Sequence, residues 1–138
     1  MFLHLLAERN LTDQFVVDSA GTGGWHVGNP ADRRMQAAAN RRGIQLPSRA
    51  RQISLDDLVD FDLVLTMDFA NLSAVRSLSD EMGGRATAEL KTMLSFARNF
   101  TETEVPDPYY GGEAGFEHVL DLLEDSCSAL LDEFTAGE

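Results

Sequence analysis

Apolar positions recur along the chain at spacings that predict helices and short buried strands. The clearest repeat lies near the C-terminus, where apolar side chains follow one another at steps of three or four residues: Phe116, Val119, Leu120, Leu123, Cys127, Leu130, Leu131 and Phe134. Such steps place the side chains on one side of a helix. We therefore expect a long helix from about Gly115 to Phe134 that packs against the core.

Three further apolar runs predict the strands of a sheet. Phe15–Val17 is a short β-rich run bounded by Asp18, and the segment Phe61–Met67 contains the run Leu63–Leu65. Continuous apolar runs of this length are typical of buried strands. A last strand is expected over Leu90–Phe96, near an edge of the sheet because it begins between charged residues.

Other helices follow from apolar spacing and from residues that start or stop helices. Asn29 and Pro30 suit the N-cap and first position of a helix that ends at Arg42, before Gly43. Ser54 to Asp57 carries a Ser-x-x-Asp capping signature. Helices are also expected from Phe2 to Arg9 and from Asp68 to Leu78, with a loop over Ser79–Thr87.

Composition indicates one globular domain spanning residues 1–138, with 43% hydrophobic and 25% charged residues. No apolar run approaches the roughly 20 residues of a membrane span, and no basic-then-apolar signal precedes the first helix. We expect a cytoplasmic protein. The single cysteine, Cys127, excludes an internal disulfide framework, and its place on the helical stripe predicts a buried structural thiol.

Charge bears on the partners of the chain. A formal net charge of −12 argues against nucleic acid as a partner, because the phosphate backbone would be repelled. Six of the eleven basic residues cluster nevertheless: Arg33, Arg34, Arg41, Arg42, Arg49 and Arg51. Two interpretations stay open: a solvated surface whose arginines pair with nearby acids, or a basic flank that attracts anionic substrates.

The segment from Glu104 to Gly112 is the strongest candidate for chemistry. Asp107 lies between two prolines, which stiffen the loop, and two tyrosines follow. A carboxylate on a rigid loop beside aromatic side chains suits proton delivery to an aromatic leaving group. The alternative is a solvated aspartate in a Pro-Gly loop.

Four blocks of sequence resemble the low-molecular-weight protein-tyrosine-phosphatase family, in family order and over nearly the whole chain. They are Asp107–Gly111 followed by Gly115–Glu117, Val17–Thr22 followed by Trp25–Gly28 and Pro30, Arg49–Ile53, and Phe61–Asp68. The resemblance implies an α/β fold of three layers, with a small parallel sheet of strand order 2-1-3-4 and helices on both faces.

The resemblance also implies roles for individual residues. Asp107 matches the general acid and base, and Ser19 matches a hydroxyl that supports the phosphate-binding loop. Trp25, Tyr109 and Tyr110 match the walls of the cleft that receives the phosphotyrosine ring. The implied substrates are phosphotyrosine-containing proteins or small aryl phosphates, with neither a metal nor an organic cofactor. Whether Tyr109 or Tyr110 is itself phosphorylated, the physiological substrate and the oligomeric state stay open.

One part of the family pattern is missing from these 138 residues. The family opens with an apolar strand and a Cys-x5-Arg-Ser/Thr-Pro phosphate loop, whereas Met1–Glu8 resembles the latter half of the helix that follows that loop. No arginine stands six residues after Cys127. We therefore expect an N-terminally truncated phosphatase domain that lacks the first, central strand, is inactive alone and folds poorly.

The sequence offers two alternatives to a truncated phosphatase. A degenerate, non-catalytic binding module would keep the cleft walls and dock a partner without turnover. An arsenate reductase on the same fold would need the missing loop and relay cysteines, which Cys127 alone cannot supply. His26 has no second histidine at metal-ligand spacing and is expected to be a surface or locally bonded side chain.

Overall fold

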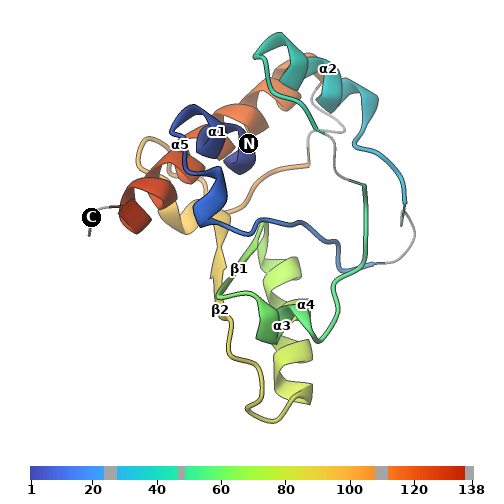
Figure 1. The fold of residues 1–138 in the computed structure, drawn as a ribbon. Coiled ribbons are helices and arrows are strands. Elements are labelled where there is room, and N and C mark those ends of the chain that lie inside the picture. The colour runs from blue at the N-terminus through green and yellow to red at the C-terminus, as the bar shows by residue number, and fades with distance from the viewer. Residues whose placement is uncertain (24–27, 47–48, 108–111, 136–138) are drawn as a thin grey trace.

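The computed structural model describes residues 1–23, 28–46, 49–107 and 112–135. Its elements follow one another as α1 (Phe2–Glu8), η1 (Thr12–Gln14), α2 (Arg33–Arg41), α3 (Asp57–Asp60), β1 (Leu63–Thr66), α4 (Phe69–Glu81), β2 (Glu89–Thr92), η2 (Met93–Phe96) and α5 (Gly112–Thr135) (Figure 1). Among these, no helix is long and apolar enough to cross a membrane.

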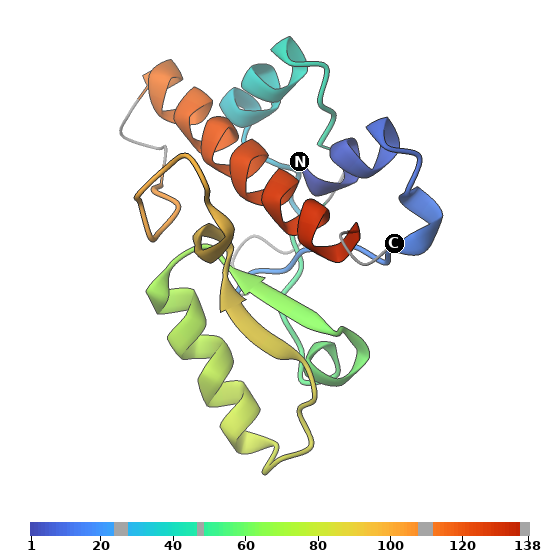
Figure 2. The same cartoon turned by 90° about the vertical axis from the view of Figure 1, so that its left-hand side faces the viewer.

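A small parallel sheet separates two groups of helices. β1 and β2 pair in parallel, with Leu63 opposite Glu89 and Thr66 opposite Thr92. Because side chains alternate across a strand, Leu63 and Leu65 pack toward α1 and α5, while Val64 packs toward α3 and α4. Figure 2 shows α5 and α4 on opposite sides of the strand pair. The α/β class and the helices on both faces are therefore as predicted.

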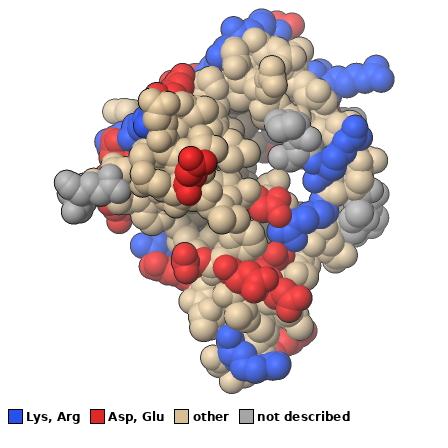
Figure 3. Space-filling model, in the orientation of Figure 1, with Lys and Arg blue, Asp and Glu red and all other residues tan. Residues whose placement is uncertain are grey.

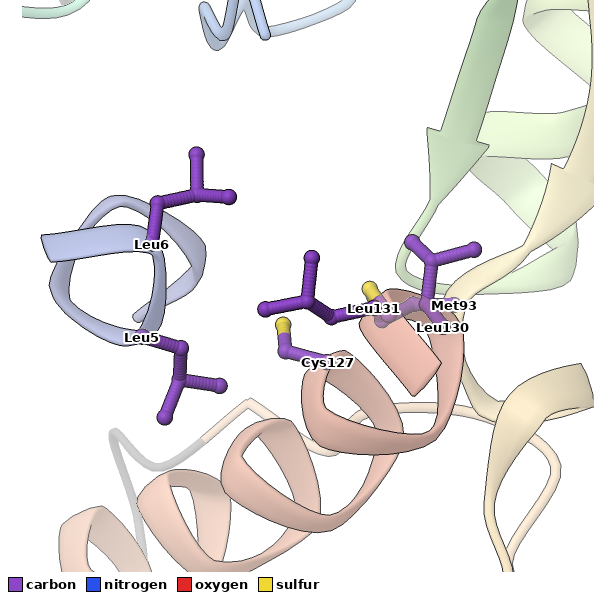
Figure 4. Packing of buried hydrophobic residues seen from close by; sticks show 6 residues of the cluster. All are labelled: Leu5, Leu6, Met93, Cys127, Leu130 and Leu131. Atoms are coloured by element: carbon purple, nitrogen blue, oxygen red, sulfur yellow. The ribbon is translucent and has the colours of Figure 1, made fainter. Parts of the chain in front are cut away.

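The largest core cluster joins the two ends of the chain. Leu5 and Leu6 of α1 face Cys127 and Leu131 of α5, with Met93 and Leu130 completing the cluster (Figure 4). Leu6 and Leu131 are fully buried. The structural role predicted for Cys127 is confirmed, because its side chain is buried among these residues. Burial raises the pKa of the Cys127 thiol to about 11.

The strand predicted over Phe15–Val17 is wrong: the segment forms no strand. Val16 is 86% exposed, while the Phe15 ring packs 5.7 Å, centroid to centroid, from the rings of Phe2 and Phe134. A strand needs a neighbour for its backbone groups. Among the described residues β1 pairs with β2 alone, so no ladder reaches Phe15–Val17.

Three predicted boundaries also differ. α2 begins at Arg33, because the Asp32 carboxylate caps it by accepting from the Arg34 N–H at 2.8 Å, and Pro30 instead pairs with Arg49. The last strand ends at Thr92, where the chain coils into η2. α4 continues three residues beyond the predicted end, to Glu81.

Candidate active site

Asp107 closes a segment, residues 97–107, that we call the acid strap. Near its end the Val105 N–H donates to the Met67 carbonyl at 2.7 Å, and the Glu104 carboxylate accepts from the Phe69 N–H at 2.8 Å. Met67 directly follows β1, and Phe69 opens α4. The strap is thus tied to the carboxyl end of the sheet, where open α/β sheets place their ligands.

The same strap is fastened to α5. The Asp125 carboxylate accepts from the Arg98 N–H at 2.8 Å, from the Asn99 N–H at 3.1 Å and from the Asn99 side-chain amide at 2.6 Å. Partial burial opposes ionisation of Asp125, but the N–H donors of Asn99 and Arg98 outweigh it and hold its pKa below the ordinary value. Glu102 bonds to the His118 ring. Asp107 is therefore the last residue of a segment that is bonded near both of its ends.

Asp107 itself is exposed, as a proton donor to a substrate must be. The structure thus fastens the residues just before the predicted acid to the carboxyl end of the sheet. Trp25, Tyr109 and Tyr110, the predicted walls of the cleft, lie outside the described residues. Their roles stay predictions.

Ser19, the other predicted site residue, lies on a second segment with different support. Ser19 is exposed, and its N–H donates to the Asp18 carboxylate at 2.8 Å. Downstream, the Gly21 N–H donates to the Arg51 carbonyl and the Ile53 N–H donates to the Gly21 carbonyl, each at 2.8 Å. A single parallel bridge therefore holds the Ser19 segment against residues 51–53.

Arg51 is the main side-chain support of this second segment. Its guanidinium donates to both Asp57 carboxylate oxygens, at 2.9 and 3.1 Å, and to Asp18 at 3.1 Å. The bonds from Arg51 hold the pKa of Asp57 below its ordinary value. Arg51 thereby links the residue before Ser19 to the first turn of α3.

The arginine cluster is expected either to pair with nearby acids or to attract anionic substrates, and its members differ in this respect. Four of its six members, Arg34, Arg41, Arg42 and Arg51, pair with carboxylates, which supports the first interpretation for them. Within the described part of the chain, Arg33 and Arg49 pair with no carboxylate. Figure 3 shows a hollow on the face turned to the viewer, with Lys and Arg side chains along its right-hand rim and Asp or Glu side chains at its lower edge. The basic part of the rim favours anions.

Cys127 is unsuited to nucleophilic attack. A thiolate is the reactive form, and a pKa of about 11 keeps this buried thiol protonated near neutral pH. Glu133 stands where a Cys-x5-Arg loop would need arginine. No group of His, Cys, Asp and Glu among the described residues is arranged to hold a metal ion.

Sequence reasoning missed the residues that fasten the acid strap. Asp125 lies 26 residues from Asn99, and His118 lies 16 residues from Glu102, so neither contact leaves a local signal. In the sequence, Arg51 is recognisable only as a member of the basic cluster, and Asp57 only as part of a capping signature. The closeness of the two residues in sequence, on either side of the start of α3, was the one signal of their ion pair.

Comparison with known proteins gives a consistent result. The family model described as "Low molecular weight phosphotyrosine protein phosphatase" matches residues 1–137. A putative low molecular weight protein-tyrosine-phosphatase of Synechocystis is 44% identical over 124 residues, covering 90% of this chain and 78% of that protein. The human low molecular weight phosphotyrosine protein phosphatase is 33% identical over 133 residues, covering 96% of this chain and 83% of that protein.

Solved structures agree with the sequence comparison. A protein tyrosine phosphatase from Entamoeba histolytica superposes with a TM-score of 0.89 at 35% identity, covering 99% of this chain and 85% of that one. YfkJ from Bacillus subtilis superposes with a TM-score of 0.86 at 37% identity, covering 99% and 84%. The protein described here therefore belongs to the low molecular weight phosphotyrosine protein phosphatase family.

Proposed function

We propose that this protein is the body of a cytoplasmic phosphatase that hydrolyses phosphotyrosine in proteins or small aryl phosphates, with Asp107 as its general acid and base. The observation that carries the proposal is the acid strap. Its bonds to Met67, Phe69 and Asp125 hold an exposed aspartate at the carboxyl end of the sheet. A fixed acid at that edge is what departure of a phenolate requires.

The reaction proceeds through two displacements. A cysteine thiolate attacks phosphorus, the bond from phosphorus to the aryl oxygen breaks, and the departing phenolate takes the proton of Asp107. The Asp107 carboxylate then accepts a proton from water, which attacks phosphorus and releases phosphate from sulfur. Backbone N–H groups and an arginine stabilise the equatorial oxygens in both steps. Ser19 supports the loop that carries those N–H groups, and Trp25, Tyr109 and Tyr110 line the ring cleft.

These 138 residues contain no Cys-x5-Arg loop. We propose that they are inactive alone and that a central strand with its phosphate loop completes the site from outside them. Two features support this. β1 uses one edge for β2, while the β-rich run Phe15–Val17 has no ladder partner among the described residues. The hollow with its basic rim would then receive a dianionic phosphate group (Figure 3).

The coding region upstream of Met1 provides the test. If it encodes an apolar strand followed by Cys-x5-Arg-Ser/Thr-Pro, the longer product should hydrolyse p-nitrophenyl phosphate. Asp107→Asn should then lower kcat by about 10²- to 10⁴-fold, whereas Asp13→Asn, at an exposed residue of η1, should leave it unchanged. An upstream region without the loop would overturn the truncation, and an unchanged kcat for Asp107→Asn would overturn the acid assignment.

A further inference from the structure

A groove lies on the outer side of β2, and neither Ser19 nor Asp107 lines it. It has a volume of about 560 Å³ and is lined by residues of α4, β2, η2 and α5. Its apolar lining includes Phe69 and Phe96, and Phe69 is 51% exposed. An exposed aromatic side chain in a groove is a usual anchor point for a partner.

The backbone of β2 gives this groove an unpaired strand edge. The Glu89 N–H donates to the Asp62 carbonyl and the Lys91 carbonyl accepts from Thr66 Oγ1, so both residues direct their backbone toward β1. In a parallel ladder the alternate residues, Leu90 and Thr92, direct theirs to the other side. No further strand covers that side among the described residues. Leu90 therefore presents its N–H and carbonyl, and Thr92 its N–H, to an added strand, whereas the Thr92 carbonyl already accepts from Ser95 Oγ at 2.6 Å.

Charge indicates what kind of strand would fit. Arg76 of α4 lines the groove, is exposed, and pairs with no carboxylate in the described part of the chain. Lys91 lies 5.5 Å from the Phe96 ring centroid and 3.2 Å from Glu89. Glu133 is the one acidic lining residue. Lys91 already pairs with Glu89, so Arg76 is the cation beside the strand edge that favours a ligand with a carboxylate, on a chain of net charge −12.

We propose that the outer edge of β2 binds an extended, acidic peptide segment of a partner protein. Such a segment adds to Leu90 and Thr92 as a third strand, gives a carboxylate to Arg76, and lays an apolar side chain between Phe69 and Phe96. Glu133 limits the segment to few acidic residues, because a second carboxylate near it would be repelled. The binding needs neither a nucleophile nor Asp107, so it stands apart from the phosphatase proposal.

The test is an NMR titration of the ¹⁵N-labelled 138-residue chain with a capped peptide of sequence Thr-Val-Glu-Phe-Thr-Val. The matched control peptide carries lysine in place of glutamate. Saturable shifts are expected at the amides of Leu90 and Thr92, and the control peptide should bind at least about tenfold more weakly, which is about 1.4 kcal/mol. Absence of shifts at about 1 mM peptide, or equal affinity for the two peptides, would overturn the proposal.

Two charge reversals complete the test. Arg76→Glu should weaken binding of the acidic peptide by about tenfold and strengthen binding of the lysine peptide. Arg85→Glu makes the same change of charge at an exposed arginine that does not line the groove, and should leave both affinities unchanged. Circular dichroism verifies that each variant is folded. Concentration-dependent self-association through Leu90 and Thr92, without peptide, would identify a second copy as the occupant and contradict the proposal.

Discussion

The segment that ends at Asp107 is held by more hydrogen bonds than the segment that carries Ser19. The acid strap before Asp107 is bonded to α4, to α5 and to the residue after β1. The segment Phe15–Ser19 is held by aromatic packing of Phe15 and by the Asp18–Arg51 pair, and Val16 is almost fully exposed. Each segment carries a residue of a family motif, yet only the acid strap is bonded to elements at both of its ends.

The difference shows that a β-rich run becomes a strand only when another strand accepts its backbone groups. Leu63–Thr66 has β2 beside it and forms a strand, whereas Phe15–Val17 has comparable side chains and forms none. Side-chain propensity is thus a weak prior, and pairing decides the outcome.

The largest expected effect concerns the core cluster of α1 and α5, against which Phe15 and Val17 of the second segment pack. Leu131→Ala should lower the free energy of unfolding by about 2–5 kcal/mol, because Leu131 is fully buried in the cluster of α1 and α5. Urea denaturation measures the change. Leu3→Ala removes the same atoms from α1 at a position that is 45% exposed, and should cost less than about 0.5 kcal/mol. Equal losses for the two variants would show that α1 and α5 do not form the core described.

Alkaline pH should weaken the same cluster through Cys127. Its pKa is raised to about 11 in the folded state, so the folded chain holds the thiol proton more tightly than the unfolded chain does. Stability should therefore fall as pH rises from the unfolded value, near 9, to about 11, by at most about tenfold in the folding constant per pH unit.

The Cys127→Ala variant isolates this contribution. Its unfolding free energy should be lower at neutral pH because a buried side chain is shortened, but it should lack the alkaline slope that wild type shows beyond the other titrating groups. Identical slopes in the two proteins would contradict the burial of the thiol.

The segment that carries Ser19 depends on the Arg51–Asp57 pair. Asp57→Asn should cost about 1.5 kcal/mol, because the Asp57 side chain is 13% exposed and its two bonds from Arg51 are charge-assisted. The pKa of Asp57 is lowered, so its stabilisation is present above the ordinary value near 4 and disappears as pH falls through the folded value.

Asp56→Asn is the matched control at the preceding, exposed residue, where no ion pair is described. It should change stability by less than about 0.5 kcal/mol. Equal losses of unfolding free energy in the two variants at neutral pH would show that the Arg51–Asp57 pair does not support the second segment. A loss from Asp57→Asn that persisted at pH 2 would show the same.

The smallest effect concerns the start of α4. Glu104→Gln weakens a carboxylate bond to the Phe69 N–H and removes a negative charge from a helix N-terminus, so it should cost about 0.5 kcal/mol. Amide exchange at Phe69 should become faster. Glu81→Gln removes the same charge from the last turn of α4, where negative charge is unfavourable, and should be neutral or slightly stabilising. Loss of stability in both variants alike would argue against the tether.

Much of the chain from Leu63 onward followed from sequence patterns, because its elements are specified locally. The three- and four-residue steps predicted α5, and the run Leu63–Leu65 predicted β1. The contacts of Asp125 and His118 could not be predicted, because they join residues that only the folded chain brings together. The strand prediction for Phe15–Val17 was wrong for a related reason. A strand forms only when two segments pair, whereas the apolar pattern describes one segment alone.

The central claim is that this chain holds the acid of a phosphatase without the thiolate that begins the reaction. Hydrolysis of p-nitrophenyl phosphate by the purified 138-residue chain tests it most directly, with Asp107→Asn prepared in parallel. We predict release of p-nitrophenol at the rate of the buffer alone for both proteins. Turnover on the order of 10 s⁻¹ by the unaltered chain, abolished in Asp107→Asn, would contradict the claim.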